Sequence, residues 1–564
     1  MPSAGQGKDH GYLVGAMRAA AVNRGTDFLS IPPFPHARVR DFAWATEPLA
    51  LVKDEEADRL LAMLSNARVG GSTWGPQPDL PPRYRLVQSD RLQPWTDGTI
   101  VWWTGPSEIP SLQRSGIRIV AAECDPWHLL KGADELACDS EAIEARLIAG
   151  LSGVPVRLLD RHDSAPALLQ KAELRALLRR LFAGGTLVDP FTGKPVTLSA
   201  AIELCGFWRG LIDRNREFAG AFGFARWKRP TTAPLLWGGR DVAFDPPPSS
   251  IRRGDAVALW RSRISPSRLA KLERYGAVEV EIEDGFIRSA GLGADCVPPQ
   301  SILVDWLGIH FDASRPSDLE QLLERVEVSA GLLARAESLR ARIVTTGLSK
   351  YDVGYDALDR RSPARHILVP GQVEDDRAVL EALGGVLTNR ALLARVRKQA
   401  PDAYLIYKPH PDVEAGHRRG ALPDTDALAY ADEIVRDRSI SSWIDLSDEV
   451  HVNSSLAGFE ALMRGKNVTT YGVPFYAGWG LTHDRGPVPH RRTRRRSLGE
   501  LVAICLLLYP RYVDPHTNLP CPLEVLIDRL LDPTVPSRPG ALVAARRAQG
   551  WLKQLRRKLV RSRT

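Results

Sequence analysis

The sequence has few cysteines and no long apolar run. Its 564 residues include six cysteines, with neither a CxxC pair nor the spacing of a zinc site among them. Scattered thiols favour a reducing compartment over a disulfide-rich secreted fold. The longest apolar run, around residues 501–509, is too short to cross a bilayer, and residues 1–15 lack the apolar core of a signal peptide. We therefore expect a cytoplasmic protein that can touch the inner membrane from that side.

The sequence also lacks a strong excess of charge. Its 75 Lys and Arg residues exceed its 67 Asp and Glu residues by only eight, and the excess lies mainly in residues 490–496 (HRRTRRR) and in the tail, residues 546–563. Basic blocks attract polyanions such as nucleic acid, acidic sugars or anionic lipid. Because aromatic residues do not interleave with these blocks as they do in a strand-binding groove, we expect no nucleic-acid partner.

The chain is too long for a single hydrophobic core. Short β-like runs that end in Gly, Pro or Asp alternate with helical patterns, and this alternation predicts an α/β fold with parallel sheets covered by helices. In such folds ligands bind at the carboxyl ends of the strands. The runs cover residues 98–105, 116–124, 277–285, 366–372, 404–411, 448–455 and 467–474.

Two ordered pairs of segments repeat within the chain. DELACDSEAIEARLIAGLSGVPV begins at Asp134 and aligns without gaps to DEVHVNSSLAGFEALMRGKNVTT, which begins 314 residues later at Asp448. VDPFTGKPVTLSAAIEL begins at Val188, and VDPHTNLPCPLEVLIDRL begins 325 residues later at Val513. The repeats predict a partial module followed by a complete one. The predicted divisions are a partial N-terminal module (1–206), a linker helix (207–233), the two halves of the complete module (234–360 and 361–532) and a basic amphipathic tail (533–564).

The two copies differ where chemistry is expected. Only the second copy is preceded by an EDG segment, within VEVEIEDGFIRSAGLG (278–293), and Arg146 stands where the second copy has Glu460. The first copy therefore lacks the acidic groups. We interpret it as a structural or acceptor-handling remnant.

Glu283 and Asp284 are the first candidate site. They end a predicted strand, and glycines after them allow the backbone to approach a ligand closely. Two adjacent buried carboxylates cannot both ionise cheaply, so their pKa values should separate. Alternation along a strand would point them to opposite sides, so that only one faces a given ligand. An ordinary EDG turn without chemistry is the competing interpretation.

The segment YKPHPDV (407–413) ends another predicted strand. Its prolines hold Lys408 and His410 in place, and a cation beside an imidazole suits a phosphate or a carboxylate. A proline turn that carries an idle histidine explains the pattern equally well.

The segment VNSSLAGFEALMRG (452–465) predicts a helix capped by Asn453 or Ser454. Free amides at such a helix start can bind phosphate. Glu460 returns to the helical face of Asn453 and is placed to accept hydrogen bonds from ribose hydroxyls. A capped helix with a solvated glutamate is the alternative.

Taken together, these segments resemble one family, the retaining capsule-polysaccharide β-Kdo glycosyltransferases, which transfer the acidic sugar Kdo onto a lipid for capsule export. The resemblance runs in the expected order through one whole module, more than half of the chain. The matching segments are WGG (237–239), EDGFIRSAGLG (283–293), PPQSILVDWLGIHFDASRPSDLE (298–320), GQVEDD (371–376), KPHPDV (408–413) and NSSLAGFEALMRGKNVTTYGVPFYAGWGLTHD (453–484).

The resemblance implies a GT-B-like pair of Rossmann-type domains. It implies CMP-β-Kdo as the donor, a lipid-linked Kdo acceptor, net retention, and neither a metal nor a cofactor. It assigns Asp284 as the nucleophile, with Glu283 as a proton-holding neighbour and His410 beside the phosphate. The donor-binding residues that it implies are Arg288 for the sugar carboxylate, Gln372, Lys408, Ser454 and Ser455 around the phosphate, and Glu460 for the ribose.

This chain departs from the long members of the family, which carry two complete modules and make two linkages. With one complete module it is expected to make one kind of linkage, or to work beside a separate Kdo transferase and the capsule-export ABC transporter. In the tail, residues 545–564 place apolar side chains on one helical face among Lys and Arg. That pattern is typical of a helix on an anionic membrane surface.

Two alternatives remain open from the sequence. The same fold could use another nucleotide sugar, with the carboxylates acting only as hydrogen-bond acceptors. The chain could also be a non-catalytic scaffold for capsule assembly that binds a nucleotide sugar or a glycolipid, since the first copy shows that the module exists without its acids.

Overall fold

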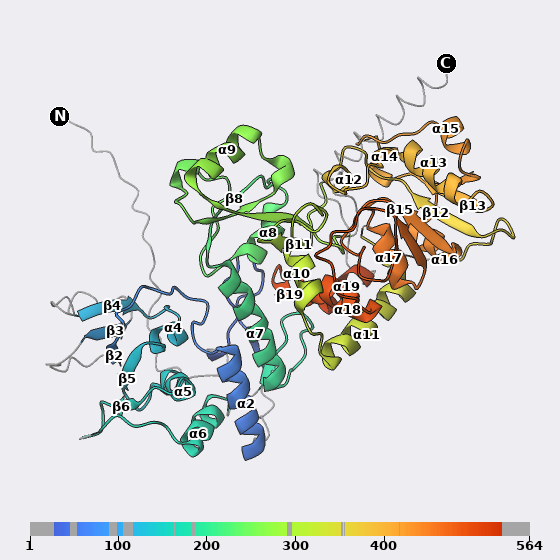
Figure 1. Ribbon diagram of the computed structural model, residues 1–564. Helices are drawn as coiled ribbons and strands as arrows, with labels where there is room; N and C mark the ends of the chain where they lie inside the picture. Colours follow the sequence, from blue (N-terminus) through green and yellow to red (C-terminus); the bar gives the residue numbers. More distant parts are fainter. Residues whose placement is uncertain are drawn as a thin grey trace, which may run out of the picture. The chain divides into compact units, whose positions relative to one another are not determined.

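A computed structural model describes residues 28–45, 53–89, 99–104, 117–162, 164–182, 186–289, 296–350, 354, 356–416 and 418–532 (Figure 1). These residues form two compact units. Unit 1 contains the described residues up to Arg209 except Pro33–Arg40, and unit 2 contains Pro33–Arg40 and the described residues from Gly210. The predicted basic tail and the glycines at 291 and 293 lie outside the described residues.

Unit 1 is built on a parallel sheet of five strands in the order β4-β3-β2-β5-β6. Its core includes Val87, Ile100, Trp102 and Ala137 from three neighbouring strands. A short antiparallel pair, β1 and β7, lies apart from this sheet. The elements are β1 (Ala43–Ala45), α2 (Asp54–Ala67), β2 (Tyr84–Gln88), β3 (Ile100–Thr104), β4 (Ile117–Ala121), α4 (Pro126–Leu130), β5 (Ala133–Cys138), α5 (Ile143–Leu151), β6 (Val156–Leu158), α6 (Lys171–Leu181) and β7 (Thr186–Val188). The unit boundary falls inside α7 (Leu198–Asn215).

The first half of unit 2 contains a six-stranded sheet in the order β19-β18-β11-β10-β9-β8. Strands β8, β9 and β10 are parallel, whereas β11, β18 and β19 run antiparallel to their neighbours, so the sheet is mixed rather than wholly parallel as predicted. Every residue of β9 (AVAL) and β11 (SILVD) is buried, as expected for apolar strands covered on both faces. The elements are β8 (Phe218–Phe222), α8 (Arg229–Leu236), β9 (Ala256–Leu259), α9 (Pro266–Tyr275), β10 (Val278–Asp284), β11 (Ser301–Asp305), α10 (Asp318–Arg325) and α11 (Ala330–Thr346).

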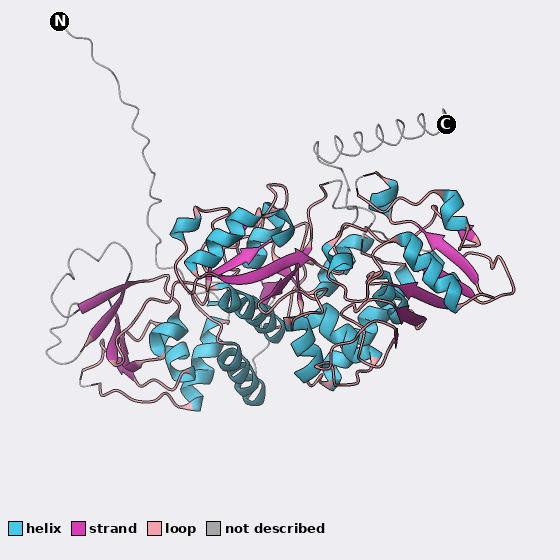
Figure 2. Cartoon of the chain, turned by 45° about the horizontal axis from the view of Figure 1, so that its top comes forward, coloured by secondary structure: helices cyan, strands magenta, loops and turns pink. Residues whose placement is uncertain are grey.

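The second half contains a parallel sheet of six strands in the order β14-β13-β12-β15-β16-β17. Figure 2 shows strands flanked by helices in this half. Leu392, Leu393 and Val396 of α13 pack on Ile367 and Leu405 of the central strands. The elements are β12 (His366–Pro370), α12 (Arg377–Leu380), α13 (Asn389–Gln399), β13 (Tyr404–Lys408), α14 (Pro411–Glu414), α15 (Asp424–Leu428), β14 (Glu433–Ile434), α16 (Ile440–Leu446), β15 (Glu449–Val452), α17 (Ala457–Met463), β16 (Asn467–Thr470) and β17 (His483–Asp484).

The chain then returns to the first half. After α18 (Leu498–Val502) and a π-helical turn (Ala503–Leu508), β18 (Pro510–Val513) and β19 (Pro520–Cys521) join the sheet of β10 and β11, and α19 (Leu523–Leu531) follows. The predicted division at 360/361 therefore misplaces this last segment, which belongs with the first sheet.

The predicted linker helix over 207–233 is wrong. The segment contains the end of α7, then β8, and then the start of α8, which continues past the predicted end to Leu236. Phe218 and Phe222 of β8 are buried, so this part of the chain belongs to the core of unit 2. The α/β fold class, the two sheet-and-helix halves of the complete module and the partial N-terminal α/β repeat are confirmed.

The internal repeat appears in the backbone as well as in the sequence. β2–β6 of unit 1 have the strand order of β12–β16, because β4-β3-β2-β5-β6 matches β14-β13-β12-β15-β16 strand by strand. The second repeated segment also keeps its turn. The Asp189 amide donates to the Lys194 carbonyl at 2.9 Å, and the Asp514 amide donates to the Leu519 carbonyl at 2.9 Å.

None of the helices in the part of the chain that the structure describes has both the length and the apolar character needed to span a bilayer.

Candidate active site

Unit 2 contains a cavity of about 1050 Å³ at the carboxyl ends of β10, β12 and β13 and beyond β15. This is the edge at which the sequence places ligand-binding residues. All the candidate residues except Arg288 line it, namely Glu283, Asp284, Gln372, Lys408, His410, Ser454, Ser455 and Glu460.

Glu283 and Asp284 both face this cavity, which corrects the expectation that alternation would separate them. The strand ends at Asp284, and Gly285 follows, where the chain leaves the sheet. A Cβ at Gly285 would lie 2.0 Å from the Ser301 hydroxyl oxygen. The glycine therefore allows the chain to approach β11 closely, rather than to approach a ligand as the sequence suggested.

Asp284 is paired with two cations. The Lys228 ammonium lies 3.2 Å from Oδ1 of Asp284, and Nε of Arg288 lies 2.9 Å from Oδ2. Burial alone would raise the pKa of Asp284, but the positive charges of Lys228, Arg288 and Lys350 outweigh it and lower the pKa to about 2. Asp284 is therefore a carboxylate throughout the physiological pH range, which is the state that a nucleophile needs.

Glu283 has the opposite tendency. Its burial, followed by the negative charge of Asp284, raises its pKa to about 7. The two neighbouring carboxyl groups thus differ in proton affinity, as adjacent buried acids should. One is a permanent anion, and the other can hold or release a proton near neutral pH.

Arg288 does not reach the cavity. Its side chain is fully buried, and its two terminal nitrogens donate to the Ser289 hydroxyl and the Val297 carbonyl, both at 2.8 Å. The sequence resemblance assigned Arg288 to the sugar carboxylate. The structure instead places it against Asp284, where it compensates the charge of that residue.

Lys408 and His410 lie at the end of β13. The Lys408 ammonium donates to the carbonyls of Asp437 and Arg438, each at 2.9 Å, and so anchors a loop whose Arg436 and Arg438 also line the cavity. Nδ1 of His410 accepts the Asp412 amide at 3.1 Å. Burial lowers the pKa of His410, so the neutral ring carries its proton on Nε2 and is a hydrogen-bond donor.

The segment after β15 supplies the serines and Glu460. The helix α17 begins at Ala457, and the Ser455 hydroxyl accepts its first amide at 3.3 Å. The prediction that Asn453 or Ser454 caps this helix is therefore wrong. The Ser454 hydroxyl donates to the Ala378 carbonyl at 2.6 Å. These bonds fix both serines at the cavity wall.

Glu460 and Gln372 hold acceptor oxygens at the same wall. Glu460 accepts the Lys350 amide at 3.1 Å, and burial raises its pKa to about 7. Gln372 donates to the Val386 carbonyl at 3.1 Å, and its Oε1 has no hydrogen-bond partner within the described ranges. A buried amide oxygen of this kind suits a ligand donor group.

Sequence reasoning missed several lining residues. Lys228 pairs with Asp284 and lies over the Trp260 ring, and both residues line the cavity. They come from segments without a strand-end motif, and Lys228 fell within the predicted linker helix. His310 also lines the cavity, and burial lowers its pKa to about 3, so its ring is neutral. Its ring packs edge-on against Phe286 and Phe475. For Lys228, the sequence offered one local signal of a binding role, namely its place between Trp227 and the start of a helix at Arg229–Pro230.

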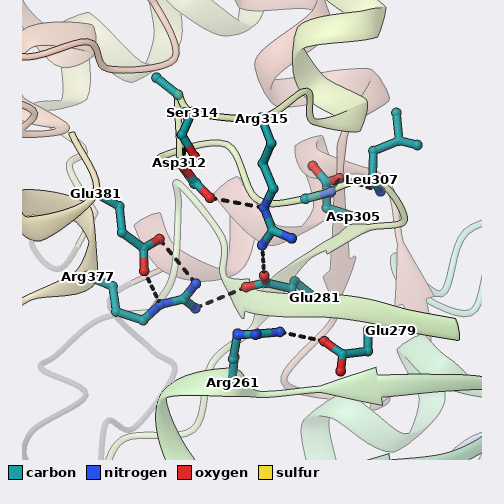
Figure 3. A network of polar contacts seen from close by, with 12 residues as sticks. Arg261, Glu279, Glu281, Asp305, Leu307, Asp312, Ser314, Arg315, Arg377 and Glu381 are labelled. Atoms are coloured by element: carbon teal, nitrogen blue, oxygen red, sulfur yellow. Dashed lines mark hydrogen bonds and ion pairs between the residues drawn. The ribbon is translucent and has the colours of Figure 1, made fainter. Parts of the chain in front are cut away.

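A network of ion pairs around the buried Glu281 connects β10 to α12 (Figure 3). Glu281 on β10 is only 3% exposed and pairs with Arg315 and, at 3.0 Å, with Arg377 of α12. Arg377 also pairs with Glu381 at 2.9 Å. The strand that carries Asp284 is thereby tied to the helix that follows the lining residue Asp376.

Within the described residues, no group of three or more His, Cys, Asp or Glu side chains is arranged to hold a metal ion.

A family model for capsule polysaccharide biosynthesis proteins matches residues 255–357 and 338–512, a range that includes every candidate residue of the cavity. The chain is also 34% identical over 432 residues to the capsule polysaccharide modification protein LipA of Neisseria meningitidis serogroup A. The chain belongs to the capsule polysaccharide biosynthesis family. The LipA match covers 72% of this chain and 61% of LipA, so the chain spans less than two thirds of that relative.

The chain is also similar to a second curated protein and to a solved structure. The lipopolysaccharide-processing protein LpsZ of Rhizobium meliloti is 47% identical over 236 residues, which are 41% of this chain and 53% of LpsZ. A solved structure named as the β-Kdo 2,4 transferase of Thermosulfurimonas dismutans KpsC is 32% identical, covers 56% of this chain and 98% of its own, and has a TM-score of 0.48. The family model and the LipA match confirm the resemblance to capsule polysaccharide biosynthesis proteins that the sequence motifs indicated.

Proposed function

We propose that unit 2 is a retaining glycosyltransferase that moves β-Kdo from CMP-β-Kdo to a lipid-linked Kdo acceptor in capsular polysaccharide biosynthesis. The observation that carries the proposal is that an ionised carboxylate, Asp284, shares one cavity with His410, Ser454 and Ser455, whose polar groups suit a phosphate. Membership in the capsule polysaccharide biosynthesis family and the motif resemblance support the choice of substrate class.

In this mechanism the donor phosphate lies against Nε2–H of His410 and the hydroxyl of Ser455, and Ser454 binds it by turning its hydroxyl away from the Ala378 carbonyl. Asp284 attacks the anomeric carbon, a glycosyl ester forms, and CMP leaves with the electrons of the broken bond. An acceptor hydroxyl then attacks the same carbon and releases Asp284. Two inversions at one carbon give net retention.

Glu283 acts as the general base in the second step. With a pKa raised to about 7 by burial, its carboxylate can take the proton of the attacking hydroxyl near neutral pH. Glu460 and Gln372 would receive the hydroxyl and amino groups of the nucleoside. Lys408 holds the loop of Arg436 and Arg438 against the phosphate side. The mechanism uses no metal and no cofactor.

The proposed partners follow from this reaction. They are the nucleotide-sugar donor, a glycolipid acceptor at the cytoplasmic face of the inner membrane, and a separate Kdo transferase with the capsule-export ABC transporter. The predicted membrane contact falls on the tail, residues 533–564, outside the described residues. Removing the tail without any change in liposome binding would contradict that contact.

The test is transfer from CMP-Kdo, generated in the reaction, to a synthetic Kdo-terminated lipid, followed by mass spectrometry. Asp284→Asn should lower the rate by roughly 10⁴-fold or more, because an amide cannot form the ester. Asp359→Asn, an exposed position in the same unit, is the matched control and should transfer at the wild-type rate.

Full turnover by Asp284→Asn would contradict the nucleophile. If the wild type used another nucleotide sugar but not CMP-Kdo, the donor assignment would be wrong. If it used no donor at all, the scaffold interpretation would replace the enzyme.

A further inference from the structure

We propose that Lys228 selects donor sugars that carry a carboxylate on the anomeric carbon. The inference rests on the proposed function, since it concerns the sugar that Asp284 attacks. It assigns to Lys228 the recognition that the sequence assigned to Arg288.

The first argument is the number of cations around Asp284. One carboxylate is paired with both Lys228 and Arg288. Arg288 is fixed, because its side chain is fully buried and its other nitrogens are bound to Ser289 and Val297. Lys228 lines the cavity. Of the two cations, only Lys228 can therefore meet a ligand.

The second argument is that the site around Lys228 is prepared for an ammonium group. Lys228 is 7% exposed, and its Nζ lies 3.2 Å from the centre of the Trp260 ring, which also lines the cavity. The Thr232 hydroxyl donates to the Lys228 carbonyl at 3.0 Å and holds the start of α8. A cation over an aromatic face is stabilised when water is excluded, so Lys228 can keep its position while it changes its anionic partner.

The third argument is the chemistry of the transfer step. Kdo carries its carboxylate directly on the anomeric carbon, so this group lies two bonds from the Asp284 oxygen that attacks. When the ester bond forms, the bond to the CMP oxygen breaks with its electrons on CMP, and Asp284 loses its charge. Lys228 can then pair with the sugar carboxylate. With a neutral sugar, its buried ammonium would keep only the neighbouring Glu283 as a negative partner, which is less favourable than a carboxylate on the sugar as well.

Two of the other cations that line the cavity, Arg263 and Lys408, fit this role less well. Arg263 lines the cavity but is exposed, so its charge is screened by water. The Lys408 ammonium is held by the carbonyls of Asp437 and Arg438, each at 2.9 Å.

The experiment gives the full-length enzyme two competing donors, CMP-Kdo and its synthetic analogue in which the sugar carboxylate is a neutral amide. The ratio of the two products, measured by mass spectrometry, reports the preference for the carboxylate as a ratio of kcat/KM. The variants are Lys228→Met, Lys228→Arg and the control Lys271→Met, which changes an exposed lysine of α9. Thermal unfolding of each variant checks that it folds.

We expect Lys228→Met to lower this preference by about tenfold or more, and Lys228→Arg to retain most of it, because arginine keeps the charge. Lys271→Met should match the wild type. If Lys228→Met slowed transfer from both donors equally, Lys228 would act only through the ionisation of Asp284, and the inference would be wrong. If the wild type transferred nothing from CMP-Kdo, the proposed function would fail first, and the inference with it.

Discussion

The five-stranded sheet of unit 1 and the second sheet of unit 2 share a strand order but differ at their strand ends. In unit 2, Glu460 lines the cavity and accepts the Lys350 amide. At the matching place in unit 1, the Arg146 guanidinium donates to the Ser140 carbonyl at 2.5 Å, and the Ser140 hydroxyl is bound by Asp160. The groups of unit 1 are thus bound to each other.

The comparison separates what makes the fold from what makes the site. Both copies keep buried apolar residues along the same strands, for example Leu136 and Ala137 in β5 and Val450 and Val452 in β15. This pattern is sufficient for a parallel sheet covered by helices. The chemistry depends on a few strand-end residues that the fold does not need. Unit 1 has kept the buried apolar residues of the strands but lacks these strand-end residues.

Exchanging the two residues that differ most tests this separation. Glu460→Arg, which gives unit 2 the residue of unit 1, should reduce transfer by about 100-fold, since it places an uncompensated cation in a buried acceptor site. Arg146→Glu should leave transfer unchanged. Initial rates for both variants, with thermal unfolding as the check on folding, provide the measurement. Equal loss from the two exchanges would show that the copies are functionally coupled.

The close approach of β10 to β11 at Gly285 belongs to unit 2 alone among the described residues. It predicts that a side chain at this position lowers the free energy of unfolding. Gly285→Ala places a methyl group 2.0 Å from the Ser301 hydroxyl oxygen and should lower the free energy of unfolding by about 1–3 kcal/mol. Gly331→Ala is the control, because it meets open space on α11 and should stabilise by up to about 1 kcal/mol. Urea unfolding measures both, and a Gly285→Ala protein as stable as the wild type would contradict the packing described.

The buried acids predict a pH dependence of stability for unit 2. The folded protein raises the pKa of Glu283 and of Glu460 from 4.5 to about 7, so it binds these protons more tightly than the unfolded chain does. The free energy of unfolding should therefore fall as the pH rises from about 4.5 to about 7. Asp284, whose pKa is lowered from 3.8 to about 2, changes the free energy of unfolding only below that pH range.

Glu283→Gln should flatten this slope by up to about 1.4 kcal/mol per pH unit, the value for one proton. The exposed Glu273→Gln on α9 is the control and should keep the wild-type slope. Chemical unfolding at a series of pH values gives the slopes. A Glu283→Gln protein with an unchanged slope would show that Glu283 is not buried as described.

The repeated turn predicts the smallest effect. Gly193 in unit 1 and Asn518 in unit 2 occupy equivalent left-handed positions, with φ of 68° and 57°. Gly193→Ala should cost about 1 kcal/mol, because a Cβ disfavours that conformation, whereas Gly193→Asn should cost less. Unfolding of the two variants checks the order, and equal costs would contradict the equivalence of the turns.

The sequence predicts the site well where it follows from topology. Residues at the carboxyl ends of neighbouring parallel strands meet at one edge, so Asp284, Lys408 and Ser454 could be placed together from their motifs alone. The repeat likewise predicts the order of strands in both copies, since both keep their buried pattern.

The remainder depends on contacts between segments that carry no motif. Lys228 follows β8, which lies two strands from β10 in the first sheet, and pairs with Asp284 at the end of β10. The sequence could not place it there, because a short strand inside a helical pattern could not be recognised. The position of Arg288 behind Asp284 depends on the bend after Gly285. Strand β18 returns to the first sheet through pairing with β11, which no local pattern indicates.

The most direct test of the account is to locate the sugar on the enzyme. The wild-type chain would be mixed with CMP-Kdo without an acceptor, quenched, digested and analysed by mass spectrometry. We predict a Kdo adduct on the peptide that contains Asp284, absent from Asp284→Asn, and no adduct on peptides from unit 1. An adduct elsewhere, or full turnover with no adduct on any peptide, would contradict the assignment of the chemistry to Asp284 in unit 2.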